Sequence, residues 1–270
     1  MSQWQGTLGF LGYGNMGSAI AGGLIGRGLV PADRVHAYDP EPARQAAAKS
    51  LGMVAADTPA GLAGAVDTLV FSVKPQVWKD AAAMVAPVLR PGARIVSIMA
   101  GVSIASLRAA LPEGVRVIRV MPNTPALVGA GAAGIALDEN CGPEDEAAAR
   151  MMFEAVGVAE VVPESAINAI TALSGSGPAY FFYLVECLVK AAVKEGLDEA
   201  VATRLAVQTA FGAGKLLAES GESASTLREK VTSKGGTTFA ALESFRADNL
   251  ESVVAAAVHA ASERARELGS

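Results

Sequence analysis

The strongest constraint on the fold is an alternation of short apolar runs with segments of helical periodicity in the first part of the chain. Apolar runs of roughly four to seven residues between helices are typical of a parallel sheet buried on both faces. This order of elements predicts a doubly wound α/β fold. Strands are expected at 7–11, 34–38, 67–73, 93–99, 115–120, 133–137 and 159–162, and helices at 15–28, 41–51, 76–89, 104–111 and 143–156.

The pattern changes near residue 164, because strand signals then disappear. Helical spacing covers 179–195, Asp198 is a candidate N-cap for a helix to 220, and further helices are expected at 226–231, 238–246 and 249–268. Two domains are therefore expected, a dinucleotide-binding domain at 1–162 and an all-α domain at 163–270. The Ala-rich helices suggest tight packing, between subunits as well as within one.

Composition excludes several classes of protein. The formal charge is −5, from 22 basic and 27 acidic side chains, and no Lys/Arg cluster suggests a nucleic-acid partner. Two cysteines and two histidines argue against a metal site and against most His-dependent catalysis. A membrane-spanning helix needs roughly 20 mostly apolar residues. The uncharged stretches 1–26, 120–137 and 165–185 are broken by Gly, Pro or Asn, so we expect no membrane partner and a cytoplasmic protein.

A Gly-rich fingerprint follows the first expected strand. Residues 12–17 read GYGNMG, which is G-x-G-x-x-G opening a helix. In such a turn the first Gly permits the tight bend, the second lets the backbone approach a pyrophosphate, and the third allows close helix–strand packing. The strand–turn–helix context therefore predicts an N-terminal Rossmann-type sheet that binds a dinucleotide.

Asp39 ends the second expected strand, where an acid would bond the ribose 2′-hydroxyl of NAD and repel the 2′-phosphate of NADP. Arg44 lies nearby in sequence and could offset that repulsion. An exposed turn that caps the next helix is the simpler interpretation of Asp39. These residues leave NAD and NADP equally open as the cofactor.

Further candidate ligand residues follow the central strands. Segments 72–75 (SVKP), 99–101 (MAG) and 121–125 (MPNTP) come at the ends of three of them. Ligands of such sheets bind outside the carboxyl ends of the strands, so we expect one crevice there. Lys74 is either a ligand of that crevice or a solvated lysine.

Two segments of the helical half are rich in small residues and are expected to be loops, 174–180 (SGSGPAY) and 233–238 (SKGGTT). The second precedes a helix, so its free N–H groups and hydroxyls suit a carboxylate or phosphate. An ordinary capping loop is the alternative interpretation.

With these motifs in view, the sequence resembles the pyrroline-5-carboxylate reductase family over almost its whole length. The resemblance is carried by GFLGYGNMGSAIAGGL (9–24), VKP (73–75), AGV (100–102), VIRVMPNTPALVGAG (117–131), LSGSGPAYFF (173–182) and VTSKGGTTFAALESF (231–245). It implies reduction of a cyclic imine to L-proline with hydride from NAD(P)H. It also implies dimers or rings of dimers, with the active site completed at a helical subunit interface.

The motifs and the resemblance together give the candidate site residues. The expected cofactor residues are Leu11, Gly12, Tyr13, Gly14, Asn15, Met16, Gly17, Asp39, Ser72, Val73, Lys74, Pro75, Ile98, Met99, Ala100 and Asn123. The expected substrate residues are Ser176, Ser233, Gly235, Gly236, Thr237 and Thr238. Thr238 is the candidate catalytic residue, for proton traffic at the imine nitrogen. By the resemblance, Asn123 would lie near the nicotinamide.

The sequence departs from the family pattern at two positions. Lys234 stands where many members carry Pro, and Asp39 where they commonly carry a small hydroxyl residue. The chemistry agrees with the resemblance, because an imine that arrives protonated needs mainly a hydride donor held at the right distance. One alternative is a β-hydroxyacid dehydrogenase, which would need a helix lysine that is missing before Lys190. Another is a non-catalytic dinucleotide-binding module.

Overall fold

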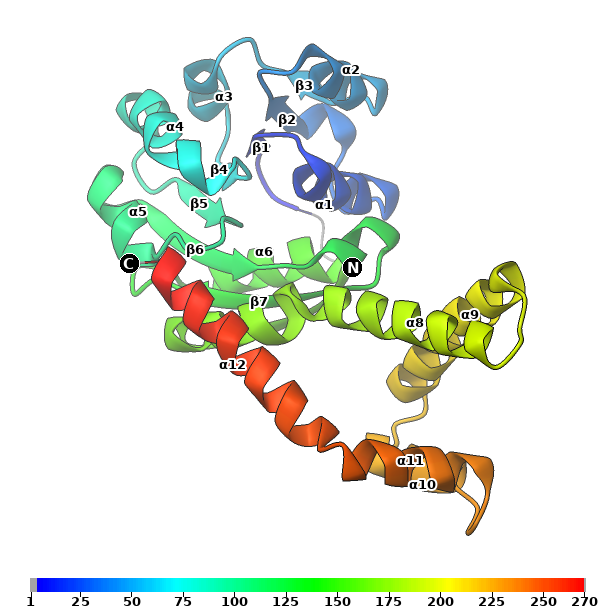
Figure 1. The fold of residues 1–270 in the computed structure, drawn as a ribbon. Coiled ribbons are helices and arrows are strands. Elements are labelled where there is room, and N and C mark those ends of the chain that lie inside the picture. Colours follow the sequence, from blue (N-terminus) through cyan, green and yellow to red (C-terminus); the bar gives the residue numbers. More distant parts are fainter. Residues whose placement is uncertain (1–3, 270) are drawn as a thin grey trace. The chain divides into compact units, whose positions relative to one another are not determined.

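The computed structural model describes residues 4–269. The chain divides into two compact units, one that runs to Ser176 and includes the end of the chain from Ala261, and one of residues 177–260. The first unit contains an eight-stranded sheet with the order β3-β2-β1-β4-β5-β6-β7-β8 (Figure 1). Its strands are β1 (Leu8–Leu11), β2 (Val35–Tyr38), β3 (Val54–Ala55), β4 (Thr68–Phe71), β5 (Arg94–Ser97), β6 (Arg116–Met121), β7 (Gly131–Leu137) and β8 (Gly157–Val161).

The first six strands of the chain are parallel, so their carboxyl ends meet at one edge of the sheet. Leu11 pairs with Tyr38 on one side and with Phe71 on the other, and Phe71 pairs with Ser97. The strand order reverses between β1 and β4, which is where doubly wound sheets bind their ligands. β7 departs from the pattern because it runs antiparallel to β6, and β8 then runs parallel to β7.

Helices cover both faces of this sheet, as the sequence predicts. One face packs on Ile20 of α1 and Met152 of α6, and the other on Leu62 of α3, Val85 of α4 and Leu107 of α5. The helices of the first unit are α1 (Asn15–Gly26), α2 (Pro42–Ser50), α3 (Pro59–Ala65), α4 (Trp78–Val85), α5 (Ile104–Ala110), α6 (Pro143–Glu154) and α7 (Ile167–Ile170). Short 3₁₀ turns are η1 (Ala32–Arg34), η2 (Pro75–Val77), η3 (Ala86–Val88), η4 (Thr124–Val128) and η5 (Glu164–Ala166).

The second unit, residues 177–260, is built of helices joined by short turns and contains no strand. It contains α8 (Gly177–Lys194), α9 (Glu199–Glu219), α10 (Ala224–Lys230), α11 (Thr237–Ala247) and the larger part of α12 (Leu250–Leu268). Asp198 caps α9 as expected, since its carboxylate accepts a hydrogen bond from the N–H of Val201 at 3.1 Å. No helix among residues 4–269 is both long enough and apolar enough to cross a membrane.

Three features differ from the sequence expectation. The strand β3 and the helix α3 were not anticipated. The segment expected as a loop at 174–180 is helical instead, because Thr171–Gly175 forms a π-helix (η6) and α8 begins at Gly177. The expected domain division at 162 follows the last strand of the sheet, whereas the compact units separate after Ser176. We keep the division at 162 as a proposal about where the dinucleotide-binding part ends.

Candidate functional site

The candidate cofactor residues gather at the edge where the parallel strands end. Gly12–Gly17 follow β1, Asp39 follows β2, Ser72–Pro75 follow β4, and Ile98–Ala100 follow β5. The register of these strands places the four segments side by side. Asn123 comes two positions after the last residue of β6, the next strand along. The structure thus brings the dispersed cofactor motifs to one place.

The Gly-rich turn needs glycine for two different reasons. Gly12 has a φ of +91°, and a methyl group on it would lie 2.6 Å from the carbonyl oxygen of Ser72. A methyl group on Gly17 would lie 2.7 Å from Ser72 Oγ and 2.9 Å from the carbonyl oxygen of Gly12. Gly14 differs, because a methyl group there would meet no atom within 4 Å. The turn is therefore packed tightly against the loop after β4 and open at Gly14.

The helix that follows the turn presents an anion-binding end. α1 begins at Asn15, and no side chain caps it. The first N–H groups of an α-helix have no partner within the helix, and the helix dipole is positive there. The open backbone at Gly14 and this uncapped end fit the pyrophosphate of a dinucleotide. The residues present therefore suit the cofactor that the sequence predicts.

Two of the candidate cofactor residues belong to the core. Leu11 is buried, and Tyr13 packs edge-on against Phe10 with the ring centroids 6.4 Å apart. The Tyr13 hydroxyl donates to Met53 Sδ at 3.3 Å, and burial raises the pKa of this phenol. Both residues can meet a cofactor through their main chain only.

Asp39 is tied to the Gly-rich turn. Its Oδ2 accepts a hydrogen bond from the N–H of Tyr13 at 2.8 Å, and its Oδ1 accepts one from the N–H of Glu41 at 3.0 Å. The guanidinium of Arg44, on α2, donates to Asn15 Oδ1 at 3.4 Å. Both charged groups thus lie at the turn. Asp39 bonds to the N–H of Glu41 just before α2, but no side chain caps that helix, so the simpler interpretation of Asp39 as a helix cap is wrong.

The loops after β4 and β5 present different groups. Ser72 is held by a hydrogen bond from its N–H to the carbonyl of Leu11 at 2.9 Å, and Lys74 is exposed just before η2. Met99 is buried, while Ala100 is exposed. A ligand at this edge would meet Lys74 as an exposed cation and the other residues mainly through their backbone.

Both ends of the Asn123 side-chain amide are hydrogen-bonded within the protein. Its Nδ2 donates to the carbonyl of Ser174 at 2.9 Å, and its Oδ1 accepts from the N–H of Ala132 at 2.8 Å. The side chain is buried and links the end of β6 to β7 and to the π-helix η6. The structure gives Asn123 the role of a brace between these elements, which sequence reasoning missed because Ser174 lies 51 residues away.

Ser176 lies where the π-helix meets α8. Its N–H donates to the carbonyl of Thr171 at 2.8 Å, which is the wider turn of a π-helix. Single π-helical turns inside helices occur frequently at functional sites. The expected loop conformation is therefore wrong, and the role of Ser176 in substrate binding stays a prediction.

The second predicted loop, at 233–238, is a turn only as far as Gly236, because Thr237 and Thr238 already belong to a helix. The N–H of Gly236 donates to the carbonyl of Ser233 at 3.0 Å, and Gly235 has a φ of +72°. This turn leads directly into α11, which begins at Thr237 and has no side-chain cap. Thr237 and Thr238 therefore occupy the first turn of a helix whose N–H groups are available to an anion.

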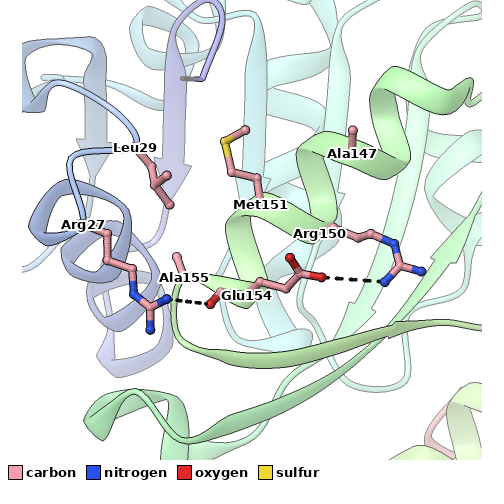
Figure 2. A pocket seen from close by; sticks show the side chains of 7 residues that line it. All are labelled: Arg27, Leu29, Ala147, Arg150, Met151, Glu154 and Ala155. Carbon is pink, nitrogen blue, oxygen red and sulfur yellow. Dashed lines mark hydrogen bonds and ion pairs between the residues drawn. The ribbon is translucent and has the colours of Figure 1, made fainter. Parts of the chain in front are cut away.

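A groove elsewhere on the first unit is not part of this arrangement. It has a volume of about 600 Å³ and is lined by Arg27, Leu29, Ala147, Arg150, Met151, Glu154 and Ala155 (Figure 2). Arg27 follows the last residue of α1, a helix of 12 residues, and such a helix is about 18 Å long. The groove therefore lies at the opposite end of α1 from the Gly-rich turn.

The first unit has the strand order of a Rossmann fold, a Gly-rich turn after β1, and an α1 helix without a side-chain cap. These features define a dinucleotide-binding protein of the Rossmann class, and its chain continues into a helical unit. Comparison with known proteins agrees for both parts. Residues 164–268 match the family described as pyrroline-5-carboxylate reductase dimerisation. Residues 7–101 match the family described as NADP oxidoreductase, coenzyme F420-dependent.

Relatives cover the whole chain. The pyrroline-5-carboxylate reductase of Pseudomonas aeruginosa is 43% identical over 263 residues, which is 96% of this chain and 95% of the relative. The structure of the Coxiella burnetii enzyme superposes with a TM-score of 0.94 at 33% identity, covering 99% of this chain and 100% of that one. The Plasmodium falciparum enzyme with NADP bound gives 0.87 at 29% identity, with 100% of each chain covered. The chain belongs to the pyrroline-5-carboxylate reductase family.

Proposed function

We propose that this chain reduces the cyclic imine 1-pyrroline-5-carboxylate to L-proline, the last step of proline biosynthesis, with hydride from NADH or NADPH. The observation that carries the proposal is family membership over the full length. The 43% identity to a pyrroline-5-carboxylate reductase spans 96% of the chain, so it includes both the Gly-rich turn and the turn at 233–238. A β-hydroxyacid dehydrogenase would share only the first of these.

The strand-end edge holds the cofactor in this proposal. The N–H groups at the start of α1 bind the pyrophosphate beside Gly14, and Ser72–Pro75 with Ile98–Ala100 line the cofactor through their main chain. Asn123 holds the end of β6 against the π-helix, so the residues beside the nicotinamide ring keep a fixed position. The bound cofactor supplies the hydride for the imine carbon.

The turn at 233–238 holds the substrate. The N–H groups at the start of α11, with Ser233, Gly235, Gly236 and Thr237, bind the carboxylate of the imino acid. Ser176 is a further substrate residue. The Thr238 hydroxyl lies at the ring nitrogen. It accepts a hydrogen bond from the protonated imine and keeps a hydrogen bond to the nitrogen of the amine product.

The cofactor supplies the hydride and the protein positions the two reactants, so the proposed reaction requires no histidine or metal. Protonation of the imine nitrogen precedes hydride addition, so the carbon that receives the hydride is already electrophilic. The protein must then fix distance and orientation, which can contribute several kcal/mol to the barrier reduction. Main-chain N–H groups and hydroxyls are sufficient for that task.

The assembly proposed is a homodimer or a ring of dimers, with no nucleic-acid or membrane partner. The match of residues 164–268 to a dimerisation family supports a homo-oligomer. We also propose a cytoplasmic location, where reduced nicotinamide cofactors and amino-acid biosynthesis are found.

Steady-state turnover tests the proposal. Purified protein is expected to oxidise NADH or NADPH when given 1-pyrroline-5-carboxylate. It is not expected to reduce NAD+ or NADP+ when given a 2- or 3-hydroxy acid. Thr238→Ala removes a hydrogen bond to a charged group, worth about 1.5–3 kcal/mol. It is therefore expected to lower kcat by about tenfold to a hundredfold, with unchanged cofactor affinity, while Thr238→Ser keeps most of the activity. Absence of turnover with both cofactors would refute the function. Unchanged kcat in Thr238→Ala would refute the role of Thr238 alone.

A further inference from the structure

Asp39 is held at the part of the Gly-rich turn that faces the adenosine end of a dinucleotide. The N–H of Tyr13 donates to its Oδ2, and the N–H of Gly12 donates to the carbonyl of Tyr38 at 2.8 Å. These two bonds fix the end of β2 against the turn. In Rossmann sites the ribose of the adenosine lies here, beside the end of the second strand. The carboxylate therefore cannot swing away without losing its bond to the turn.

The carboxylate still has capacity for a ligand. A carboxylate offers about four acceptor positions, and two backbone N–H groups occupy one on each oxygen. The remaining positions can accept hydrogen bonds from the ribose hydroxyls. They cannot accept anything from a phosphate, which has no proton to donate at neutral pH beyond the small monoanionic fraction.

Arg44 does not compensate fully for this charge. Its contact with Asn15 is long, at 3.4 Å, and its Nε lies 3.7 Å from Glu41 Oε2. Its side chain is 40% exposed, so its charge is screened by solvent. The formal charges of Asp39, Glu41 and Arg44 sum to −1 at this corner. The Glu41 side chain, at 63% exposed, is screened even more than Arg44, so the half-buried Asp39 dominates the local charge. A phosphate monoester carries about −1.5 to −2 charges at pH 7, so it is repelled there.

We infer that this chain binds NADH in preference to NADPH and that Asp39 is the residue that determines the preference. The inference rests on the cofactor site of the proposed function and adds the choice between the two cofactors. Arg44 acts in the opposite sense, since its guanidinium lies at the same turn as Asp39 and attracts a 2′-phosphate, so it maintains the weaker binding of NADPH.

Calorimetric binding of NADH and of NADPH, without imine, tests this, because the two ligands differ only in the 2′-phosphate. Wild type is expected to bind NADH at least about tenfold more tightly. Asp39→Asn keeps an acceptor for the N–H of Tyr13 and removes the charge, so it should bind NADPH about tenfold better with little change for NADH. Arg44→Gln should weaken NADPH only. Asp33→Asn, the same charge change ahead of β2, is the matched control and should leave the ratio unaltered.

The possible results distinguish a wrong cofactor preference from a wrong dinucleotide site. Tighter binding of NADPH by wild type, or equal effects of Asp39→Asn on both ligands, would overturn the inference and leave the enzyme assignment intact. Failure of wild type to bind either cofactor would overturn the dinucleotide site itself. Ratios of kcat/KM for the two cofactors should follow the ratios of the dissociation constants. Asp39→Ser, which also removes the acceptor for Tyr13, should weaken both ligands while shifting the ratio in the same direction as Asp39→Asn.

Discussion

Gly17 packs closely against both the Gly-rich turn and the loop that follows β4. It lies in the first turn of α1, and its Cα faces both the carbonyl of Gly12 and the hydroxyl of Ser72. The serine hydroxyl could rotate away from an added methyl group, but the backbone carbonyl is fixed by the turn. A substitution here therefore displaces the helix from the turn that it completes.

Gly17→Ala is expected to destabilise the protein by about 1–3 kcal/mol through overpacking and to weaken cofactor binding at least about tenfold. Gly22→Ala is the matched control, since Gly22 lies on the same helix and a methyl group there meets no atom within 4 Å. That control should raise stability by up to about 1 kcal/mol, because Gly is a poor helix former. Denaturant unfolding and NADH titration measure both effects. Equal behaviour of the two variants would contradict the assigned close packing.

The identities of the site residues follow from the sequence better than their contacts do. Gly12, Gly14 and Gly17 could be assigned from their spacing, because each glycine has a separate physical reason in this turn. The bond between Asp39 and the N–H of Tyr13 joins residues 26 apart, and local patterns carry no information about it. The same holds for the brace made by Asn123. Contacts of this range depend on the packing of the whole sheet.

At the scale of elements, the turn Ser233–Gly236 shows how one substitution can change the rigidity of a binding loop. Its hydrogen bond and the positive φ of Gly235 are those of a type II turn, in which Lys234 occupies the second position. Proline is favoured at that position because its ring fixes φ near −65°. The chain therefore has a turn whose geometry suits proline but whose residue is a flexible lysine.

Lys234→Pro is expected to raise the free energy of unfolding by about 0.4–1 kcal/mol, because it reduces the entropy of the unfolded chain. Lys234→Ala removes the same charge without the ring, so the difference between the two variants isolates the effect of rigidity. The midpoint of denaturant unfolding, at one protein concentration, measures it. A proline variant no more stable than the alanine variant would show that the turn adopts another conformation in solution.

The elements that the sequence predicted are those with a strong hydrophobic period. The apolar runs of β1, β4, β5 and β6 are fully or largely buried, so their patterns were clear. β3 has only two residues, Val54 and Ala55, and pairs with β2 alone. A signal for α3 was present, because Thr58 caps it by accepting from the N–H of Gly61 at 3.0 Å, with Pro59 at the first helical position. Thr-Pro before an apolar segment is a helix-start signal that could have been used.

The π-helix could not have been predicted from composition. Its Ser174 and Gly175 favour turns by local propensity. In the structure, the bond from Asn123 to Ser174 and the approach of Met121 to Gly175 hold the segment in a helical form. A methyl group on Gly175 would lie 2.7 Å from Met121 Cε, so Gly175 packs against the end of the Met121 side chain. Tertiary contacts determine the conformation of this segment.

At the scale of the whole molecule, the two units differ sharply in how much they bury. The first unit has an apolar core on each face of its sheet. Within residues 177–260, all of which the structure describes, only Gly177 and Ala202 are buried. Large apolar side chains are exposed there instead, among them Phe181 at 67%, Phe182 at 63% and Phe211 at 62%. Exposed apolar surface of this extent marks an interaction site.

A second copy of the chain is the partner that the family match supports, so Phe211→Glu should disrupt the assembly. A carboxylate buried in an apolar interface costs several kcal/mol, which weakens a dimer by about a hundredfold or more. Light scattering after size-exclusion chromatography should give twice the chain mass or a multiple of it for wild type, and a smaller mass at equal concentration for Phe211→Glu. Met84→Glu is the matched control, since Met84 is 50% exposed on α4 of the first unit and should not affect assembly.

Turnover should fall together with assembly in Phe211→Glu, because the resemblance places the active site at a helical subunit interface. Phe211 itself contributes no group to the proposed chemistry, so lost activity would report the interface rather than a missing catalytic residue. Raising the protein concentration should restore both mass and turnover over the same range. A monomeric wild type that turns over normally would contradict this view, and the apolar surface of α8 and α9 would then need a different partner.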